Sequence, residues 1–103
     1  MPRGRKSSVD GLPYEARVYL NNQVLVPAGV VRRLGIGDAT HANVLISVNG
    51  TLYFLEGVKL LRSRFSGASR WFTIPKPVRN KLGIRPLDTV RVLCIQPVSS
   101  PTN

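Results

Sequence analysis

The stretch Phe72-Thr-Ile-Pro-Lys-Pro-Val-Arg-Asn-Lys-Leu-Gly-Ile84 repeats the pattern of Val24-Leu-Val-Pro-Ala-Gly-Val-Val-Arg-Arg-Leu-Gly-Ile36 at a fixed offset. In this alignment Pro27 matches Pro75, and Leu-Gly-Ile matches Leu-Gly-Ile. A repeat of this kind indicates two copies of one structural unit within the chain of 103 residues.

The repeated stretch predicts a short helix in each copy. Pro27 closes an apolar run that is typical of a strand and opens the helix, where a missing N–H costs nothing. Val30 and Leu34 are four residues apart and share one helix face. Gly35 follows the last helical residue, where a left-handed C-cap is favoured. The second copy has the same residue types at the same places. Because each helix has fewer than two turns, packing must hold it.

The other segments read as strands joined by turns. The pair Asn49-Gly50 is a strong hairpin signal, since both central residues of a type I′ turn need positive φ. Asn21-Asn22 marks a second turn. Strands are predicted at residues 17–20, 23–26, 43–48, 51–55, 58–65, 70–74 and 89–96. The fold class is therefore mostly β with two short helices, and closing the sheet into a barrel would remove its exposed edges.

The segment from Pro75 to Val90 resembles the signature of AbrB-type (SpoVT–AbrB) DNA-binding domains, and residues 23–36 are similar. In that family a strand leads through proline into a short basic helix, then Leu-Gly-Ile, an Asp and a β-hairpin. Leu87 stands where the family prefers Gly. The resemblance covers residues 17–55 and 58–96. It implies a swapped-hairpin, AbrB-like β-barrel, which two copies in one chain would form as an intrachain pseudo-dimer.

The expected organisation is one compact domain with flexible ends. Residues 1–13 are predicted to be a flexible basic arm, 14–56 the first repeat, 57–96 the second repeat and 97–103 a disordered tail.

The charge favours a polyanionic partner. Fifteen Lys and Arg oppose five Asp and Glu, which gives a net charge of +10. Nucleic acid is the first candidate and an anionic membrane surface the second. Residues 1–51 carry +3 and residues 52–103 carry +7, so the second copy should supply more phosphate contacts. A solvated charged face is the ordinary alternative for any single residue.

The resemblance places DNA contacts in the short helix and the first hairpin of each copy. Carried over to this chain, the candidates are Arg17, Arg32, Arg33, Arg62, Arg64, Arg70, Lys76, Arg79 and Lys81. Arg3 and Arg5 lie in Arg-Gly-Arg, which resembles an AT-hook that enters a narrow minor groove, although a generic basic tail fits equally well. Trp71 could stack on a base, but packing within the protein is favoured.

Enzyme and metal chemistry find no support in the sequence. No catalytic residue, cofactor site or metal site is predicted, because the chain has one Cys (Cys94), one His (His41) and no recognisable catalytic motif. Asp38 and Asp88 read as turn or cap residues. The absence of a signal-peptide pattern or a long apolar run predicts a cytoplasmic, nucleoid-associated protein with no membrane partner.

The expected function is binding of double-stranded DNA by a prokaryotic transcriptional regulator. Two alternatives stay close to it: a nucleoid architectural protein, and the antitoxin of a toxin–antitoxin pair. The short neutral tail after Gln96 disfavours a toxin partner, since antitoxins of this type usually add a long, often acidic segment there. A protein-interaction module with incidental charge is a rival of another class. A homodimer of pseudo-dimers is left open.

Overall fold

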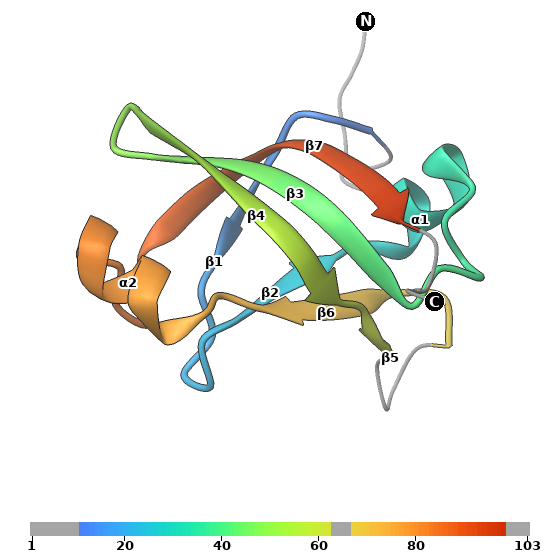
Figure 1. Ribbon diagram of the computed structural model, residues 1–103. Coiled ribbons are helices and arrows are strands. Elements are labelled where there is room, and N and C mark those ends of the chain that lie inside the picture. Colours follow the sequence, from blue (N-terminus) through green and yellow to red (C-terminus); the bar gives the residue numbers. More distant parts are fainter. Residues whose placement is uncertain (1–10, 63–66, 99–103) are drawn as a thin grey trace, which may run out of the picture.

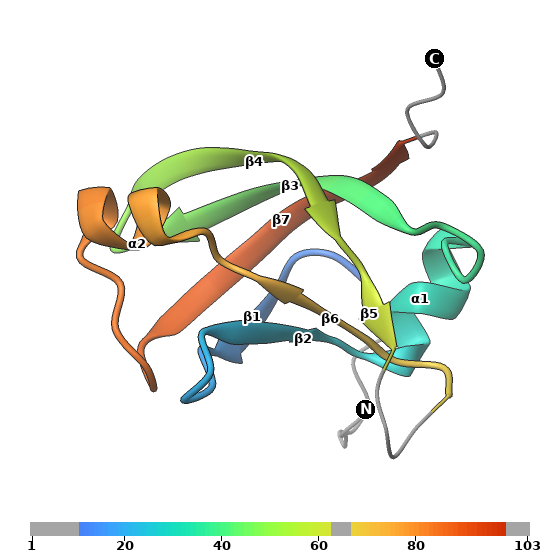
Figure 2. The ribbon, with the colours of Figure 1, turned by 60° about the horizontal axis from the view of Figure 1, so that its bottom comes forward.

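The computed structural model describes residues 11–62 and 67–98 and is mostly β, with two helices of seven residues each. Its elements in chain order are β1 (Tyr14–Arg17), β2 (Gln23–Val26), α1 (Ala28–Leu34), β3 (His41–Val48), β4 (Thr51–Lys59), β5 (Leu61–Arg62), β6 (Arg70–Thr73), α2 (Lys76–Leu82) and β7 (Thr89–Val98). Figures 1 and 2 show α1 and α2 at opposite ends of the molecule.

The strands form two antiparallel sheets and not one closed barrel, so the prediction of a closed barrel is wrong. One sheet has the order β1-β7-β3-β4, and the other has the order β2-β6-β5 (Figure 2). The chain crosses from the first sheet to the second at two corners, Val18 after β1 and Leu60 after β4. Both corner side chains are buried. The core therefore lies between the two sheets.

The structure repeats with the sequence. Helix α2 occupies the positions that the repeat makes equivalent to α1, and β7 contains the counterpart of β3. The equivalent strands β2 and β6 pair with each other, and Val24 lies opposite Phe72, its own counterpart. The strands β3 and β7 also pair. The two copies therefore interlock about a pseudo-two-fold axis through these strand pairs instead of standing side by side.

The two corners are equivalent as well. The Val18 N–H donates to the Asp88 carbonyl at 2.8 Å, and the Leu60 N–H donates to the Thr40 carbonyl at 2.8 Å. The acceptors Thr40 and Asp88 are counterparts in the repeat, but Val18 and Leu60 are closer together in the sequence than this repeat would place them. The connection from the corner to the equivalent strand, β2 in the first copy and β6 in the second, is thus longer in the second copy, where it includes β5 and residues 63–66.

Strand β4 combines two roles in one continuous strand. Its first half, Thr51–Leu55, returns along β3 as a hairpin. Its second half lies along the start of β3 as β1 lies along β7, with Lys59 opposite His41. The register shifts between the halves, where Gly57 adopts φ 65° and its N–H donates to the Asn43 side chain at 2.8 Å. A glycine bulge therefore joins the end of the first copy to the start of the second.

Alternation along the strands builds the core, as the pattern of β3 shows. Its even-numbered residues are buried and its odd-numbered residues are half-buried. The fully buried side chains, chiefly valine and isoleucine, include Phe72, Ile36, Ile46, Leu55, Ile74, Val18, Val24, Val26, Val30, Val44, Val90 and Val92. This β-branched core suits pleated strands of period two.

Several predicted boundaries need correction. The first strand is Tyr14–Arg17 and not 17–20, because the chain leaves the sheet at Val18. The predicted strand 58–65 is divided between β4 and β5 at the second corner. The last strand continues to Val98, which lies opposite His41, so the tail does not begin at residue 97. Leu12, placed in the flexible arm, packs against the core. The rest of the arm and of the tail, residues 1–10 and 99–103, lies outside the described residues.

Glycine ends both helices as predicted, and the turn signal is also confirmed. Gly35 and Gly83 adopt φ 65° and 68°, and Asn49-Gly50 has positive φ at both positions.

A Cβ added at Gly83 would meet no heavy atom within 4 Å, so alanine there would be strained by its backbone alone. We expect Gly83→Ala to lower the free energy of unfolding by about 1 kcal/mol, as measured by urea denaturation. Equal stability of the variant would contradict this reading.

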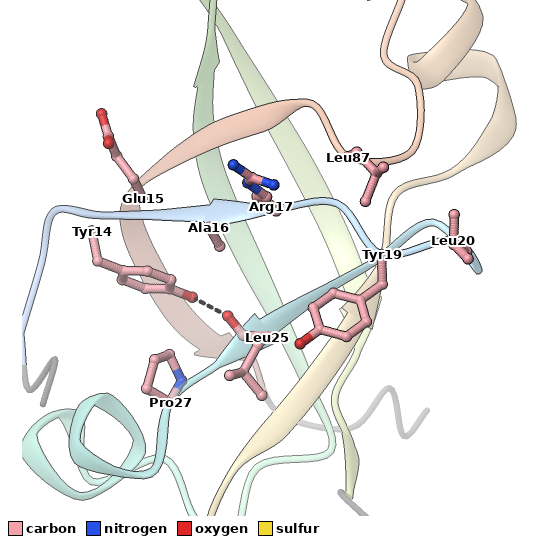
Figure 3. A pocket seen from close by; sticks show the side chains of 9 residues that line it. All are labelled: Tyr14, Glu15, Ala16, Arg17, Tyr19, Leu20, Leu25, Pro27 and Leu87. Carbon is pink, nitrogen blue, oxygen red and sulfur yellow. Dashed lines mark hydrogen bonds between the residues drawn. The ribbon is translucent and has the colours of Figure 1, made fainter.

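Tyr14 links the two sheets. Its ring is buried, and its hydroxyl donates to the Leu25 carbonyl of β2 at 2.9 Å (Figure 3). Burial raises the pKa of the Tyr14 phenol well above its ordinary value. The folded state keeps this proton at a pH where the unfolded state loses it, so the stabilisation is complete below about pH 10 and falls as the pH rises further.

We therefore expect the native protein to lose stability more steeply than Tyr14→Phe as the pH rises above about 10. At neutral pH the variant should be less stable by about 1 kcal/mol, because the hydrogen bond is gone. Urea denaturation of both proteins across this pH range checks the prediction. Parallel pH profiles would contradict it, because every other side chain is common to both proteins.

Candidate nucleic-acid interface

Cationic side chains dominate the exposed surface. Among the described residues, nine lysine and arginine side chains are exposed: Arg17, Arg32, Arg33, Lys59, Arg62, Lys76, Lys81, Arg85 and Arg91. Only three acidic side chains are exposed in the same part of the chain: Glu15, Asp38 and Glu56. The excess of positive charge in the described residues therefore lies on exposed side chains.

One group lies on the last turn of α1. Arg32 and Arg33 are both exposed there, while Val30 and Val31 are buried in the core. Cations at a helix C-terminus also interact favourably with the helix dipole, and this gives them a structural role beside any binding role.

A second group surrounds α2. Lys76 at its first residue and Lys81 in its last turn are exposed. The Lys81 Nζ lies 5.9 Å from the centre of the Tyr53 ring, a cation–π contact that holds α2 near β4. Arg79 is half-buried, and its Nε donates to the Ile74 carbonyl at 2.9 Å. Arg79 is therefore partly occupied by the fold, and Lys76 and Lys81 are the freer cations of this helix.

The two helix groups do not converge, because α1 and α2 lie at opposite ends of the molecule (Figure 1).

A third group lies on the outer face of the larger sheet. Arg17 of β1 lies opposite Thr89, and Arg91, two residues further along β7, lies opposite Glu15. Arg17 and Arg91 are thus diagonal neighbours on one face. The arrangement fits a long ligand that follows the surface better than a compact anion held at one point.

Arg70 does not belong to this exposed set, contrary to the prediction. Its side chain is 4% exposed. The guanidinium donates to three backbone carbonyls, those of Gly67 at 2.8 Å, Ser69 at 2.9 Å and Gly37 at 2.9 Å. Gly37 belongs to the loop after α1, so Arg70 ties the second copy to the first. In this structure the Arg70 guanidinium forms hydrogen bonds within the fold and is not exposed for binding.

The remaining predicted residues are placed as follows. Arg62 is exposed at the end of β5. Arg3, Arg5 and Arg64 lie outside the described residues. Trp71 is half-buried and makes an edge-on contact with Tyr19, with ring centres 4.7 Å apart, which agrees with the packing interpretation.

Three exposed cations were missed by sequence reasoning: Lys59, Arg85 and Arg91. Lys59 is the counterpart of Arg17, but the relation appears only when the longer connection of the second copy is allowed for. Arg91 could have been found by alternation, since Val90 and Val92 on either side of it are buried. Arg85 follows the repeated Leu-Gly-Ile directly.

Two residues singled out in the sequence, Asp88 and Cys94, lie in a turn and in a strand. The Asp88 carboxylate accepts the Arg85 N–H at 2.9 Å within the turn that precedes β7, which confirms its predicted turn role. Cys94 is a free, half-buried thiol on β7. Within residues 11–62 and 67–98, no three His, Cys, Asp or Glu side chains come together as a metal site would require. No helix in the same ranges is long and apolar enough to cross a membrane.

Comparison of the chain with protein-family models, with curated proteins and with solved structures gives no match, so its function has to be argued from its own surface and symmetry.

Proposed function

We propose that the chain binds double-stranded DNA along its cationic surface and acts as a transcriptional regulator. The observation that carries the proposal is the balance of nine exposed cations against three exposed acids in the described residues. A surface of this kind attracts phosphates and releases the counterions that DNA condenses. Association with the nucleoid would follow from such binding.

The pseudo-two-fold arrangement supports the same proposal. Equivalent strands of the two copies pair with each other, which is what an AbrB-like swapped-hairpin unit formed by a single chain requires. The proposed contacts are Arg17 with Lys59, Arg32 with Arg33, and Lys76 with Lys81. These pairs draw equally on the two copies, but six of the nine exposed cations of the described residues belong to the second copy, which therefore offers more phosphate contacts in total. Phosphate contacts of this type set the position of the protein, while a few arginines reach base edges.

The deciding experiment is a titration of the protein with A·T-rich and G·C-rich duplexes at several salt concentrations. The logarithm of the association constant should fall linearly with the logarithm of the salt concentration, by about 0.9 for each phosphate contact. A clear preference for one duplex favours a regulator, whereas equal affinity favours an architectural protein. No binding at low salt would overturn the proposal and favour a protein-interaction module.

Two double variants locate the contacts. Lys76→Gln with Lys81→Gln, and Arg32→Gln with Arg33→Gln, should each reduce the salt slope by about two if both ends of the molecule touch DNA. Glu15→Gln and Glu56→Gln serve as controls, because they alter exposed charge but remove no cation. A salt slope unchanged in both cationic variants would exclude the helices from the interface. Arg79→Ala should reduce the slope by about one if Arg79 contacts DNA, and it should also destabilise the start of α2.

A further inference from the structure

An open apolar groove separates β1 of the larger sheet from β2 of the smaller one. Its volume is about 640 Å³, within the range of small-molecule sites. Figure 3 shows its lining, with the rings of Tyr14 and Tyr19 and the side chain of Leu25 on the inner side. The complete lining is Tyr14, Glu15, Ala16, Arg17, Tyr19, Leu20, Leu25, Pro27 and Leu87. The only buried polar side-chain group in it, the Tyr14 hydroxyl, already donates to the Leu25 carbonyl. The interior therefore offers an apolar surface.

The apolar character is a property of the first copy and not of the fold. The pseudo-symmetric groove in the second copy is lined by Glu56, Gly57, Val58, Lys59, Leu61, Thr73 and Pro75 and has a volume of about 350 Å³. Glu56 stands there in place of Tyr14, and Thr73 in place of Leu25. The repeat therefore does not dictate tyrosine and leucine at these two positions.

Leu87 is held in an unfavourable backbone conformation beside this groove. Its φ is 75°, a value that glycine adopts freely and leucine avoids, and its side chain is 59% exposed. Glycine would fit this backbone without strain, and the leucine side chain is not buried in the core. Neither the backbone conformation nor core packing therefore explains why residue 87 is a leucine. Backbone strain of this kind gathers at ligand sites, and the Leu87 side chain forms part of the groove rim (Figure 3).

Arg17 is a cation of the groove lining, and the residue opposite it on the neighbouring strand β7 is uncharged. Glu15 lies opposite Arg91 on the β1–β7 ladder, so these two charges offset each other. Arg17 lies opposite Thr89 and is exposed. In Figure 3 its side chain leaves β1 on the side away from the Tyr14 ring, so its charge lies outside the apolar interior, while the residue still forms part of the lining.

We propose that this groove binds a small amphipathic anion, with its hydrocarbon body between Tyr14, Tyr19 and Leu25 and its carboxylate toward Arg17. The apolar interior accepts the body, and the cation at the rim favours the negative end. Another molecule of the same protein is disfavoured as the occupant, because each molecule has a net charge of +10 and the two would repel each other. The proposal does not rest on DNA binding: it uses none of the cations of α1 or α2 and shares only Arg17 with the proposed DNA contacts.

Trp71 provides a built-in reporter. It is the only tryptophan in the chain, and its ring lies 4.7 Å from that of Tyr19, which lines the groove. Titration of the full chain with decanoate, followed by tryptophan fluorescence and by calorimetry, should give saturable binding of one equivalent. Decanol and decylammonium have the same chain with a neutral and a positive end. Decanol should bind about two- to fivefold more weakly than decanoate, and decylammonium more weakly still.

Three variants separate binding from folding. Leu87→Gly removes a wall of the groove and relieves the strained φ, so affinity should fall about tenfold while the melting temperature stays equal or rises. Leu25→Thr copies the counterpart groove and should also weaken binding. Arg17→Gln should bring the affinity for decanoate down to that for decanol. Leu52→Ser changes a leucine that is 59% exposed on β4, away from the groove, and is the matched control.

Loss of binding in Leu87→Gly and Leu25→Thr with retention in Leu52→Ser supports the proposal. Non-saturable binding, equal affinity of all three decyl compounds, or unchanged affinity in Leu87→Gly would each overturn it. None of these outcomes depends on whether the protein binds DNA.

Discussion

Replacing Phe72 by alanine is expected to lower the free energy of unfolding by about 3–5 kcal/mol. The Phe72 side chain is fully buried and lies opposite Val24 at the centre of the β2–β6 pair. Because Val24 belongs to the first copy and Phe72 to the second, this pair joins the two copies at the pseudo-two-fold axis. A loss of this size is a large part of the roughly 5–15 kcal/mol that stabilises a typical domain.

Urea denaturation followed by circular dichroism measures this effect. Phe54→Ala is the matched control, because Phe54 lies on β4 with its side chain 52% exposed. The control should lose less than about 1 kcal/mol. Similar losses in the two variants would mean that the strand pair at the axis is not the centre of the core.

Replacing Arg70 by methionine should cost about 3 kcal/mol, the second large effect, because three carbonyl acceptors that are buried or partly buried would lose a charged donor. These acceptors are the carbonyls of Gly37, Gly67 and Ser69. Methionine keeps much of the apolar stem, so the loss reports mainly the hydrogen bonds. The affinity of the folded variant for DNA should be unchanged, since the guanidinium is not available at the surface.

Arg62→Met gives the opposite expectation. Arg62 lies opposite Arg70 on the β5–β6 ladder and is exposed. Its replacement should leave stability within about 0.5 kcal/mol and reduce the salt slope of DNA binding by up to about one. If Arg70→Met weakens DNA binding of the folded protein while Arg62→Met does not, the assignment of Arg70 to the fold is wrong.

The helices and their caps could be predicted from the sequence because local rules set them. Proline before each helix, the valine and leucine on one face, and glycine at positive φ all depend on residues within one turn. The Asn49-Gly50 turn is local in the same sense. The strand boundaries and the open arrangement of two sheets depend on partners far along the chain. The corner at Leu60, for example, is fixed by a hydrogen bond to Thr40, and no local signal marks it.

The cationic site could be predicted as a property of the whole surface, but single residues could not be assigned. Composition established the charge, and most of the predicted cations within the described residues are exposed. Arg70 and Arg91 show the limit. Both stand in strands, one next to Trp71 and the other between two valines, yet the first is buried by carbonyls of a distant loop and the second faces solvent. Alternation predicts exposure only when the register and the neighbouring loops are known.

The glycine bulge at Gly57 has a consequence for the stability of this protein at low protein concentration. By joining the end of one copy to the start of the next within β4, it turns the meeting of two halves into an event inside one molecule. Assembly of the core then follows first-order kinetics, and dilution cannot separate the halves as it separates the subunits of an obligate dimer. Covalent joining also frees each half to mutate alone, which a homodimer encoded by one repeat cannot do. The apolar groove on one side and its polar counterpart on the other show such a difference between the halves.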